Sequence, residues 1–280
     1  MGNGNILVGF DRYGQVKDFY FPYVGLEDQI GGFGANRIGV FVDNQMAWFH
    51  SPEWAIKIDY QPETLASRIS ASHQRLELTL EFTDAVYNEK DIFIKKIAIK
   101  NNAGRQRQAK VFFNQEFQFY ESNRANTAYY DPDLKAIVHY KGRRLVVVAG
   151  ALDGNSFDDY ATGLMGIEGK TGTFVDAEDG QLSKNPIEYG SVDSTIGFTI
   201  MLKAGEEKVF YYWFSVAKTF KEAKQLNAYV LEKTPDYLLE TTQNFWRAWV
   251  NKSNFCFYRL DEKTIALFKK SLLIIRTHVD

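Results

Sequence analysis

The residues with the clearest capacity for chemistry are acidic side chains that lie close together in one short segment. Asp176, Glu178 and Asp179 could exchange protons as an acid/base pair or bind a calcium ion, because carboxylates do both. Their spacing does not match the EF-hand loop, in which acidic residues alternate before a glycine and a glutamate closes the site. The simpler interpretation, which we adopt, is a solvated loop in which Asp179-Gly180 makes a turn.

Histidine and cysteine are the other candidates for catalysis or metal binding. His50 and His139 could form a mutarotase-like acid/base pair, because imidazole titrates near neutral pH, but we predict a structural role for each. Cys256 stands between two phenylalanines, which indicates a small buried hydrophobic residue rather than a nucleophile. As the single cysteine, it excludes an internal disulfide and a CxxC zinc site. The sequence therefore assigns no catalytic residue, no cofactor-binding residue, no metal ligand and no cofactor.

Aromatic residues make up 15% of the chain, and they can either stack on sugar rings or fill the core of β-sheets. The richest stretches span residues 19–23, 117–120, 129–130 and 210–214. Alternation along a strand buries about half of such residues, so we predict that these stretches pack in the core or between domains. Trp246 and Trp249 are predicted to anchor a helical segment on the sandwich.

The net charge of the chain argues against a nucleic-acid partner, and the lengths of its apolar runs argue against a membrane span. The 280 residues include 33 basic and 35 acidic side chains, a net charge of −2 that provides no basic surface for nucleic acid. We interpret Lys95-Lys96 and Arg143-Arg144 as charges on strand surfaces. The start, MGNGNILVGF, lacks a signal-peptide pattern, and the longest apolar runs are too short to span a bilayer. We therefore expect a cytoplasmic protein.

Most of residues 1–218 alternate between polar and apolar side chains, which is typical of strands with one buried face. The predicted strands cover residues 38–42, 75–82, 91–100, 110–119, 144–149, 196–202 and 208–214. The Lys95-Lys96 pair within the third of these could mark a bulge or a change of face. Turn-forming residues separate the strands, and no helical pattern intervenes. This combination predicts an antiparallel β-sandwich and argues against a βαβ array.

A helical pattern replaces the alternation near Thr219. We predict helices over residues 220–233 and from Pro235 to about residue 250, the second with proline at its first turn. A third helix is expected from Asp261, its N-cap, to the end of the chain.

The third helix is apolar on nearly every side. Leu272, Leu273, Ile274 and Ile275 are consecutive, and a helix of this kind needs neighbours on most of its surface. Leaving such side chains in water forfeits about 1.5–3 kcal/mol each relative to burial. The helix could lie in a groove on the sandwich. We favour the other interpretation, in which the chain has been cut and this helix belongs to a domain that it lacks.

Several segments occur together in a distinctive order. They are Gly2–Phe10 (GNGNILVGF), Gly14–Gly25 (GQVKDFYFPYVG), Tyr130–Pro132 with His139–Lys141, and Asp176–Ser183 (DAEDGQLS) followed by Gly190–Asp193. Jointly they resemble bacterial and archaeal glucoamylases, glucodextranases and related trehalases of glycoside hydrolase family 15, over essentially the whole chain.

The resemblance implies a mainly β fold, a super-β-sandwich like that of galactose mutarotases, followed by C-terminal α-helices. It implies the sandwich domain over 1–218, a helical linker packing on it over 219–259, and the first helix of an absent (α/α)6 catalytic barrel over 260–280. Both catalytic carboxylates lie in that barrel, about 6.5–9.5 Å apart for inversion. They therefore have no counterpart in this chain.

The function implied is that of a non-catalytic N-terminal domain that stabilises and positions the barrel. The full enzyme would release glucose from α-glucans, dextran or trehalose-like substrates with inversion. As an alternative to the solvated loop, the resemblance would let the segment with Asp176, Glu178 and Asp179 pack against the barrel. No role is assigned to Arg276, His278 and Asp280, which lie where the barrel begins. The expected partners are that barrel, an α-glucoside substrate in the full enzyme, and a second copy of the isolated chain.

Two other functions remain open. A free-standing carbohydrate-binding module would explain the aromatic residues but not the apolar terminal helix. An aldose mutarotase-like enzyme would share the sandwich architecture, and it would need a histidine and a carboxylate that converge in one cleft. Fold kinship alone does not establish either activity.

Overall fold

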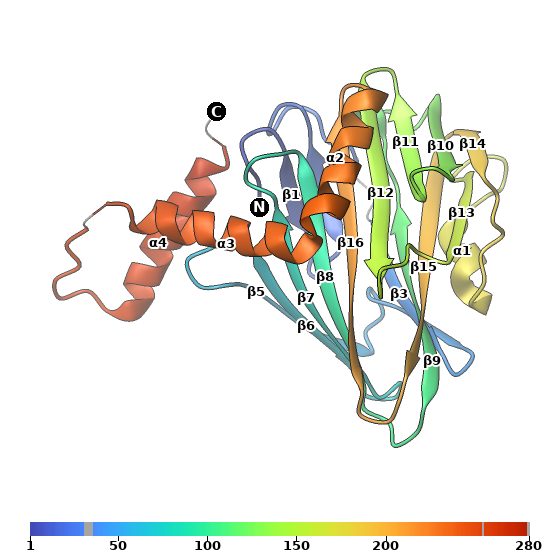
Figure 1. The fold of residues 1–280 in the computed structure, drawn as a ribbon, viewed down its shortest axis with the longest axis horizontal. Coiled ribbons are helices and arrows are strands. Elements are labelled where there is room, and N and C mark those ends of the chain that lie inside the picture. The colour runs from blue at the N-terminus through green and yellow to red at the C-terminus, as the bar shows by residue number, and fades with distance from the viewer. Residues whose placement is uncertain (31–35, 254, 279–280) are drawn as a thin grey trace.

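The computed structural model describes residues 1–30, 36–253 and 255–278 (Figure 1). The strands are β1 (Leu7–Phe10), β2 (Val16–Tyr20), β3 (Ile38–Val42), β4 (Gln45–Trp48), β5 (Trp54–Tyr60), β6 (Ser67–His73), β7 (Leu78–Val86), β8 (Ile92–Asn101), β9 (Arg107–Gln115), β10 (Asn126–Asp131), β11 (Ala136–Lys141), β12 (Arg144–Leu152), β13 (Asp159–Leu164), β14 (Ile187–Gly190), β15 (Val192–Leu202) and β16 (Glu207–Ala217). The helices are α1 (Thr173–Asp176), α2 (Phe220–Lys233), α3 (Pro235–Asn251) and α4 (Glu262–Arg276), with 3-10 turns η1 (Phe119–Glu121) and η2 (Ala177–Asp179).

Two large sheets and one hairpin account for the strands of the described residues. Nine strands pair in the order β14-β10-β11-β12-β16-β8-β7-β6-β5, and five in the order β13-β15-β9-β3-β4, while β1 and β2 pair with each other. Within the described ranges, every pairing is antiparallel. The predicted fold class, a mainly β antiparallel sandwich followed by α-helices, is confirmed.

Each predicted strand overlaps a strand of the structure, and two are shifted by three to four residues at both ends, 75–82 to 78–86 and 110–119 to 107–115. The segment 75–82 begins in a turn closed by a hydrogen bond from the Glu77 amide to the Gln74 carbonyl, so β7 starts only at Leu78. The segment 110–119 leaves the sheet early, because β9 ends at Gln115 and Phe119 belongs to η1.

The Lys95-Lys96 pair does not interrupt β8. The register with β7 is continuous and places Lys95 opposite Asp84, whose Oδ1 lies 2.8 Å from the Lys95 Nζ. Because the Asp84 carboxylate neutralises the Lys95 ammonium inside the sandwich, β8 can bury Lys95 without a bulge that would turn it outward. The prediction that Lys95 is a surface charge is therefore wrong, and so is that for Arg144, which is largely buried beside Glu27.

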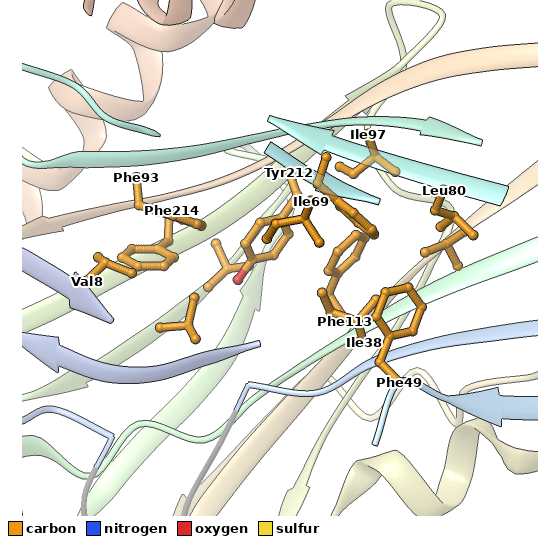
Figure 2. Packing of buried hydrophobic residues seen from close by; sticks show 14 of the residues in the cluster. Val8, Ile38, Phe49, Ile69, Leu80, Phe93, Ile97, Phe113, Tyr212 and Phe214 are labelled. Carbon is orange, nitrogen blue, oxygen red and sulfur yellow. The ribbon is translucent and has the colours of Figure 1, made fainter. Parts of the chain in front are cut away.

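The core lies between the inner faces of the two large sheets (Figure 2). Phe113 from the five-stranded sheet stacks on Tyr212 from the nine-stranded sheet at 4.7 Å between ring centroids. Phe93 stacks on Phe214 at 4.8 Å, which extends the aromatic layer along the nine-stranded sheet. Core packing is thus confirmed for much of the predicted aromatic content, whereas Tyr23 is 60% exposed on a loop.

Helices α2 and α3 occupy the predicted ranges to within one residue. The Thr219 side chain accepts a hydrogen bond from the Glu222 amide and caps α2. Trp213 on β16 lies under α2 and donates its Nε1–H to Asn227 Oδ1 at 2.8 Å, so the indole is both buried and satisfied. The Trp246 indole of α3 is buried against the main core, as predicted.

Helix α4 begins after the Asp261 cap, which accepts from the Thr264 amide, and ends at Arg276 rather than at the last residue. Leu273 is its one buried residue. Leu267, Ile274 and Ile275 are 65%, 41% and 59% exposed, respectively. In the described part of the chain, no helix is both long and apolar enough to cross a membrane.

Candidate functional site

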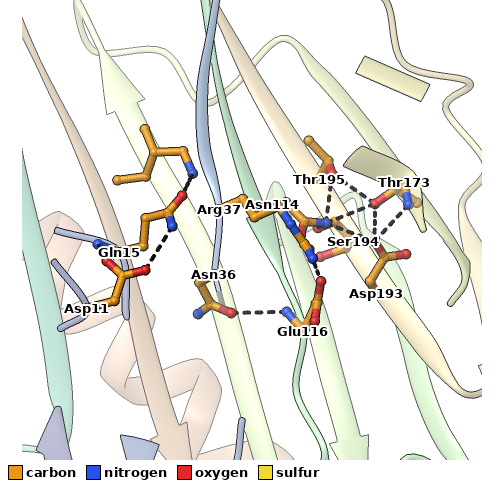
Figure 3. A network of polar contacts seen from close by, with 11 residues as sticks. Asp11, Gln15, Asn36, Arg37, Asn114, Glu116, Thr173, Asp193, Ser194 and Thr195 are labelled. Atoms are coloured by element: carbon orange, nitrogen blue, oxygen red, sulfur yellow. Dashed lines mark hydrogen bonds and ion pairs between the residues drawn. The ribbon is translucent and has the colours of Figure 1, made fainter. Parts of the chain in front are cut away.

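The most connected polar cluster lies on the five-stranded sheet, on the face that points away from the main core (Figure 3). Asp193 on β15 receives three hydrogen bonds at its Oδ2: from Asn114 Nδ2 at 2.8 Å, from the Thr173 amide at 2.7 Å and from the Thr173 hydroxyl at 2.9 Å. Asp193 is fully buried, and this desolvation raises its pKa to about 6, although the three donors and Arg37 oppose the rise. The cluster therefore ties α1 to the sheet.

Arg37 extends this cluster toward the surface. Its guanidinium forms an ion pair with Glu116, donates to Asn114 Oδ1 at 3.0 Å, and lies 4.2 Å from the Phe174 ring centroid. The Glu116 amide in turn donates to Asn36 Oδ1. Every charged group here has an internal partner, so the arrangement fits a structural role better than acid/base chemistry on a substrate.

His139 lies on the opposite, core-facing side of the same region. The Ser194 hydroxyl donates to Gln115 Oε1 at 2.8 Å, and His139 Nε2 lies 2.7 Å from the Ser194 oxygen. Since the serine proton is engaged, His139 must donate from Nε2, which assigns the neutral tautomer. Burial lowers the pKa of His139 to about 3. The predicted structural role of His139 fits this setting, because the ring stays neutral and out of contact with solvent.

The other histidines do not converge with a carboxylate in any cavity described here. His50 is exposed after β4, and partial burial and the nearby Arg37 charge lower its pKa. His73 is buried, accepts at Nδ1 from the Leu76 amide, and has its Nε2 3.5 Å from Glu53 Oε2.

The acidic side chains are exposed, as predicted, but the segment forms short helical turns instead of a loop. It forms α1 and η2, ended by Gly180 in the left-handed conformation with φ 82°, so the predicted turn itself is confirmed. Asp176 accepts from the Ser183 amide at 2.7 Å, and Asp179 accepts from the Gln181 amide at 2.8 Å. These carboxylates thus serve to close local turns.

A cavity of about 660 Å³ lies beside this segment, bordered by Asp176, Glu178, Asp179 and Glu188 together with threonine and glycine residues. It has no aromatic ring in its lining. Among the described residues, no group of three or more His, Cys, Asp and Glu side chains could hold a metal ion.

A second cavity, of about 460 Å³, separates α4 from residues 59–64. Lys269 forms an ion pair with Glu63, and Lys270 Nζ lies 4.6 Å from the Tyr60 ring centroid. These contacts, with Leu273, hold α4 against the end of β5 while its outer surface remains open.

The remaining predicted residues lie near this helix. Cys256 is exposed, so the prediction of a buried cysteine is wrong: it sits in the segment between α3 and α4, where Phe255 is exposed as well. His278 lies just after α4, with Nδ1 3.0 Å from the Ile274 carbonyl oxygen. Asp280 lies outside the described residues.

The sequence patterns did not identify Asp84, Lys95 or Asp193 as buried charged residues. A charged residue at a core-facing position of an alternating strand was the sequence signal that could have predicted a buried charge. Asp84 has the same parity as Leu80 and Phe82, which are buried.

The known proteins to which this chain is similar include glycoside hydrolases. The chain is 21% identical, over 283 residues, to an uncharacterized glycosyl hydrolase of Methanocaldococcus jannaschii, with 98% of this chain and 44% of that protein covered. A bacterial glucoamylase solved in complex with acarbose superimposes with a TM-score of 0.78 and 12% identity, over 98% of this chain and 39% of that one. The chain resembles glycoside hydrolases along its whole length. A scan against models of protein families finds no match.

A more distant structural neighbour is a family GH92 α-mannosidase of Bacteroides thetaiotaomicron. Its TM-score is 0.51 at 11% identity, over 99% of this chain and 38% of that one. The chain spans less than half the length of each of these three proteins. The resemblance to glucoamylases is therefore confirmed for the fold, a sandwich followed by C-terminal helices.

Proposed function

We propose that this chain is the non-catalytic N-terminal domain of a glucoamylase-type enzyme of glycoside hydrolase family 15. The sandwich would occupy residues 1–218, the linker 219–259 and the first helix of an (α/α)6 catalytic barrel 260–280. The whole enzyme would hydrolyse α-glucosidic bonds of α-glucans, dextran or trehalose-like substrates with inversion. The domain would stabilise the barrel and position it, and the barrel would supply both carboxylates.

The observation that carries this proposal is the surface of α4. One residue of this helix, Leu273, is buried on the sandwich side, while Leu267, Ile274 and Ile275 face away from it and are exposed. Phe268 and Phe255 add to the same open region. Large apolar patches on a folded domain mark interaction sites, and a helical barrel offers apolar helices of the required kind.

The mutarotase alternative has less support from the site. His139 is buried and neutral, and His50 is exposed with no cavity around it. The carbohydrate-binding alternative draws on exposed aromatic residues, which the proposed function accommodates as well. It leaves the apolar surface of α4 without an explanation.

The proposal predicts that the 280-residue chain is inactive by itself. Incubation with maltose, maltotriose, dextran or trehalose is expected to release no glucose above a heat-killed control. A chain extended through the proposed barrel should release glucose as the β-anomer, which polarimetry or NMR detects. Glucose release by the 280-residue chain would contradict the non-catalytic assignment.

A second prediction concerns the exposed residues of α4. Leu267→Glu and Ile275→Glu are expected to change the stability of the 280-residue chain by no more than about 0.5 kcal/mol, since neither side chain is buried. They should suppress the concentration-dependent self-association of the isolated chain, measured by sedimentation velocity, because the apolar patch is then charged.

The matched control is Leu231→Glu on α2, where Leu231 is 57% exposed against 59% for Ile275. This control should leave self-association unchanged. If Ile275→Glu unfolded the chain, the Ile275 side chain would already pack against other residues of the 280-residue chain. The proposal that it docks on a barrel would then fail.

A further inference from the structure

One face of the nine-stranded sheet carries tyrosines that the helices of the described residues leave uncovered. Helix α2 packs over β12 and β16, and Figure 1 shows β11, β10 and β14 beside it without a helix on that side. Tyr140 on β11, Tyr129 on β10 and Tyr189 on β14 lie there with Thr127 and Ile187. We call these five residues the tyrosine face.

The strand register places the five residues on one side of the sheet. Tyr140 is opposite Thr127, and Thr127 is opposite Tyr189, so these three form one row across β11, β10 and β14. Tyr129 and Ile187 form the next row, two positions along. Residues two apart in a strand share a face, and the two outer tyrosines of the first row are two strand spacings apart, roughly 10 Å.

Tyr189, Tyr140 and Ile187 of the tyrosine face are open to solvent, Tyr129 is partly exposed, and Thr127 between them is buried. Tyr189 is 65% exposed, Tyr140 is 39% exposed, and Tyr129 packs edge-on against Tyr140 with 6.1 Å between ring centroids. Within the described ranges, no protein group forms a hydrogen bond with any of the three tyrosine hydroxyls. Neither row contains a charged side chain.

We propose that the tyrosine face binds a neutral oligosaccharide chain, an α-glucan under the proposed function on which this inference rests. A pyranose ring has an apolar C–H face and a rim of hydroxyls, which match the ring and the hydroxyl of tyrosine. An apolar protein surface would instead bury the three hydroxyls without partners. The absence of charge in the two rows gives a phosphate-bearing ligand nothing to pair with.

The shape of the face favours a polymer over a small ligand. Neither of the two cavities includes Tyr129, Tyr140 or Tyr189 in its lining, so the contact is shared among rings on a sheet face. Strand β14 is also at the opposite end of the sheet from β5, against which α4 lies. The tyrosine face would thus stay open when a catalytic domain covers α4, and it would raise the local concentration of polymer for that domain.

The test is affinity electrophoresis of the 280-residue chain in native gels that contain soluble starch or dextran. Wild type is expected to be retarded, and Tyr189→Ala and Tyr140→Ala should each raise the apparent Kd at least fivefold. Tyr189→Phe, which keeps the ring and removes the hydroxyl, should have a smaller effect. Tyr258→Ala is the matched control, because Tyr258 is 74% exposed in the segment between α3 and α4, and it should be retarded like wild type.

Several results would overturn the inference. Wild type that migrates freely in starch and dextran, or Tyr189→Ala that is retarded as strongly as wild type, would do so. Retardation by hydroxyethylcellulose alone would overturn the α-glucan assignment. A dimer that Tyr189→Ala abolishes, without retardation by sugar, would show that a second copy covers this face. The assay needs no catalytic activity, so glucose release by the barrel-extended chain tests the proposed function separately.

Discussion

Replacing Lys95 by methionine is expected to destabilise the chain by about 3–5 kcal/mol at pH 7, because a buried carboxylate then loses its counter-ion. Asp84 and Lys95 are both almost completely buried, and Phe10, Phe82 and Phe93 surround the ammonium within 6 Å of their ring centroids. Burial raises the pKa of Asp84, and Lys95 and the Ser67 hydroxyl partly offset the rise. Urea unfolding followed by circular dichroism measures the loss.

The matched control for this prediction is the double variant Asp84→Asn/Lys95→Met. It removes both charges while the amide oxygen can still accept from Ser67, which donates to Asp84 Oδ2 at 2.7 Å. Buried ion pairs contribute little net stability over neutral groups that fill the same space, so the double variant should regain at least half of the loss. A Lys95→Met variant as stable as wild type would show that Asp84 is solvated or already protonated at neutral pH.

The second large effect concerns the free energy of unfolding, on which His139 and Asp193 are expected to impose opposing pH dependences. Burial lowers the pKa of His139 from 6.5 to about 3, so the unfolded chain binds a proton there before the folded chain does. Its contribution to stability is complete above pH 6.5 and is lost as the pH falls, by about 3 kcal/mol at pH 4.

Asp193 acts in the opposite direction. Burial raises its pKa from 3.8 to about 6, so the folded chain holds the proton more tightly than the unfolded chain. Its contribution is complete below pH 3.8 and is lost as the pH rises through 6, by about 3 kcal/mol. Between pH 4 and 6 the two slopes cancel in the wild type.

Single variants separate the two slopes. His139→Gln should gain about 3 kcal/mol relative to wild type between pH 7 and pH 4, and Asp193→Asn should gain about 3 kcal/mol between pH 4 and pH 7. Both amides can keep the native hydrogen bonds, and comparison at each pH removes the background from other groups. If the unfolding free energies of wild type and both variants changed in parallel at pH 4, 5, 6 and 7, neither His139 nor Asp193 would cause the predicted pH dependence.

Local patterns in the sequence were enough to predict the elements of the fold. Alternation identified residues 38–42 as a strand, and capping residues located helices at Phe220, Pro235 and near Asp261. The wrong predictions concern residues whose burial depends on tertiary contacts and not on adjacent residues in the sequence. Phenylalanines flank Cys256, yet the segment between α3 and α4 is exposed, so local hydrophobicity did not produce burial.

The polar interior could not be predicted in the same way. Alternation shows that Lys95 lies on the same face of its strand as the residues two positions away. Which residue lies opposite it depends on the register of β7 and β8, and that residue is Asp84. The cluster around Asp193 joins β15, β9 and α1, three elements that the sequence separates.

The sequence by itself determined an antiparallel sandwich, three C-terminal helices, the absence of an internal disulfide or CxxC zinc site, and a last helix with more apolar surface than one contact can cover. The tertiary structure alone decided which charges are buried in pairs, that His139 is neutral and enclosed, and that tyrosines from β10, β11 and β14 share one open face. The physical reason is that periodicity is a property of one segment, whereas pairing and exposure depend on the strand register and on the helices that cover each sheet.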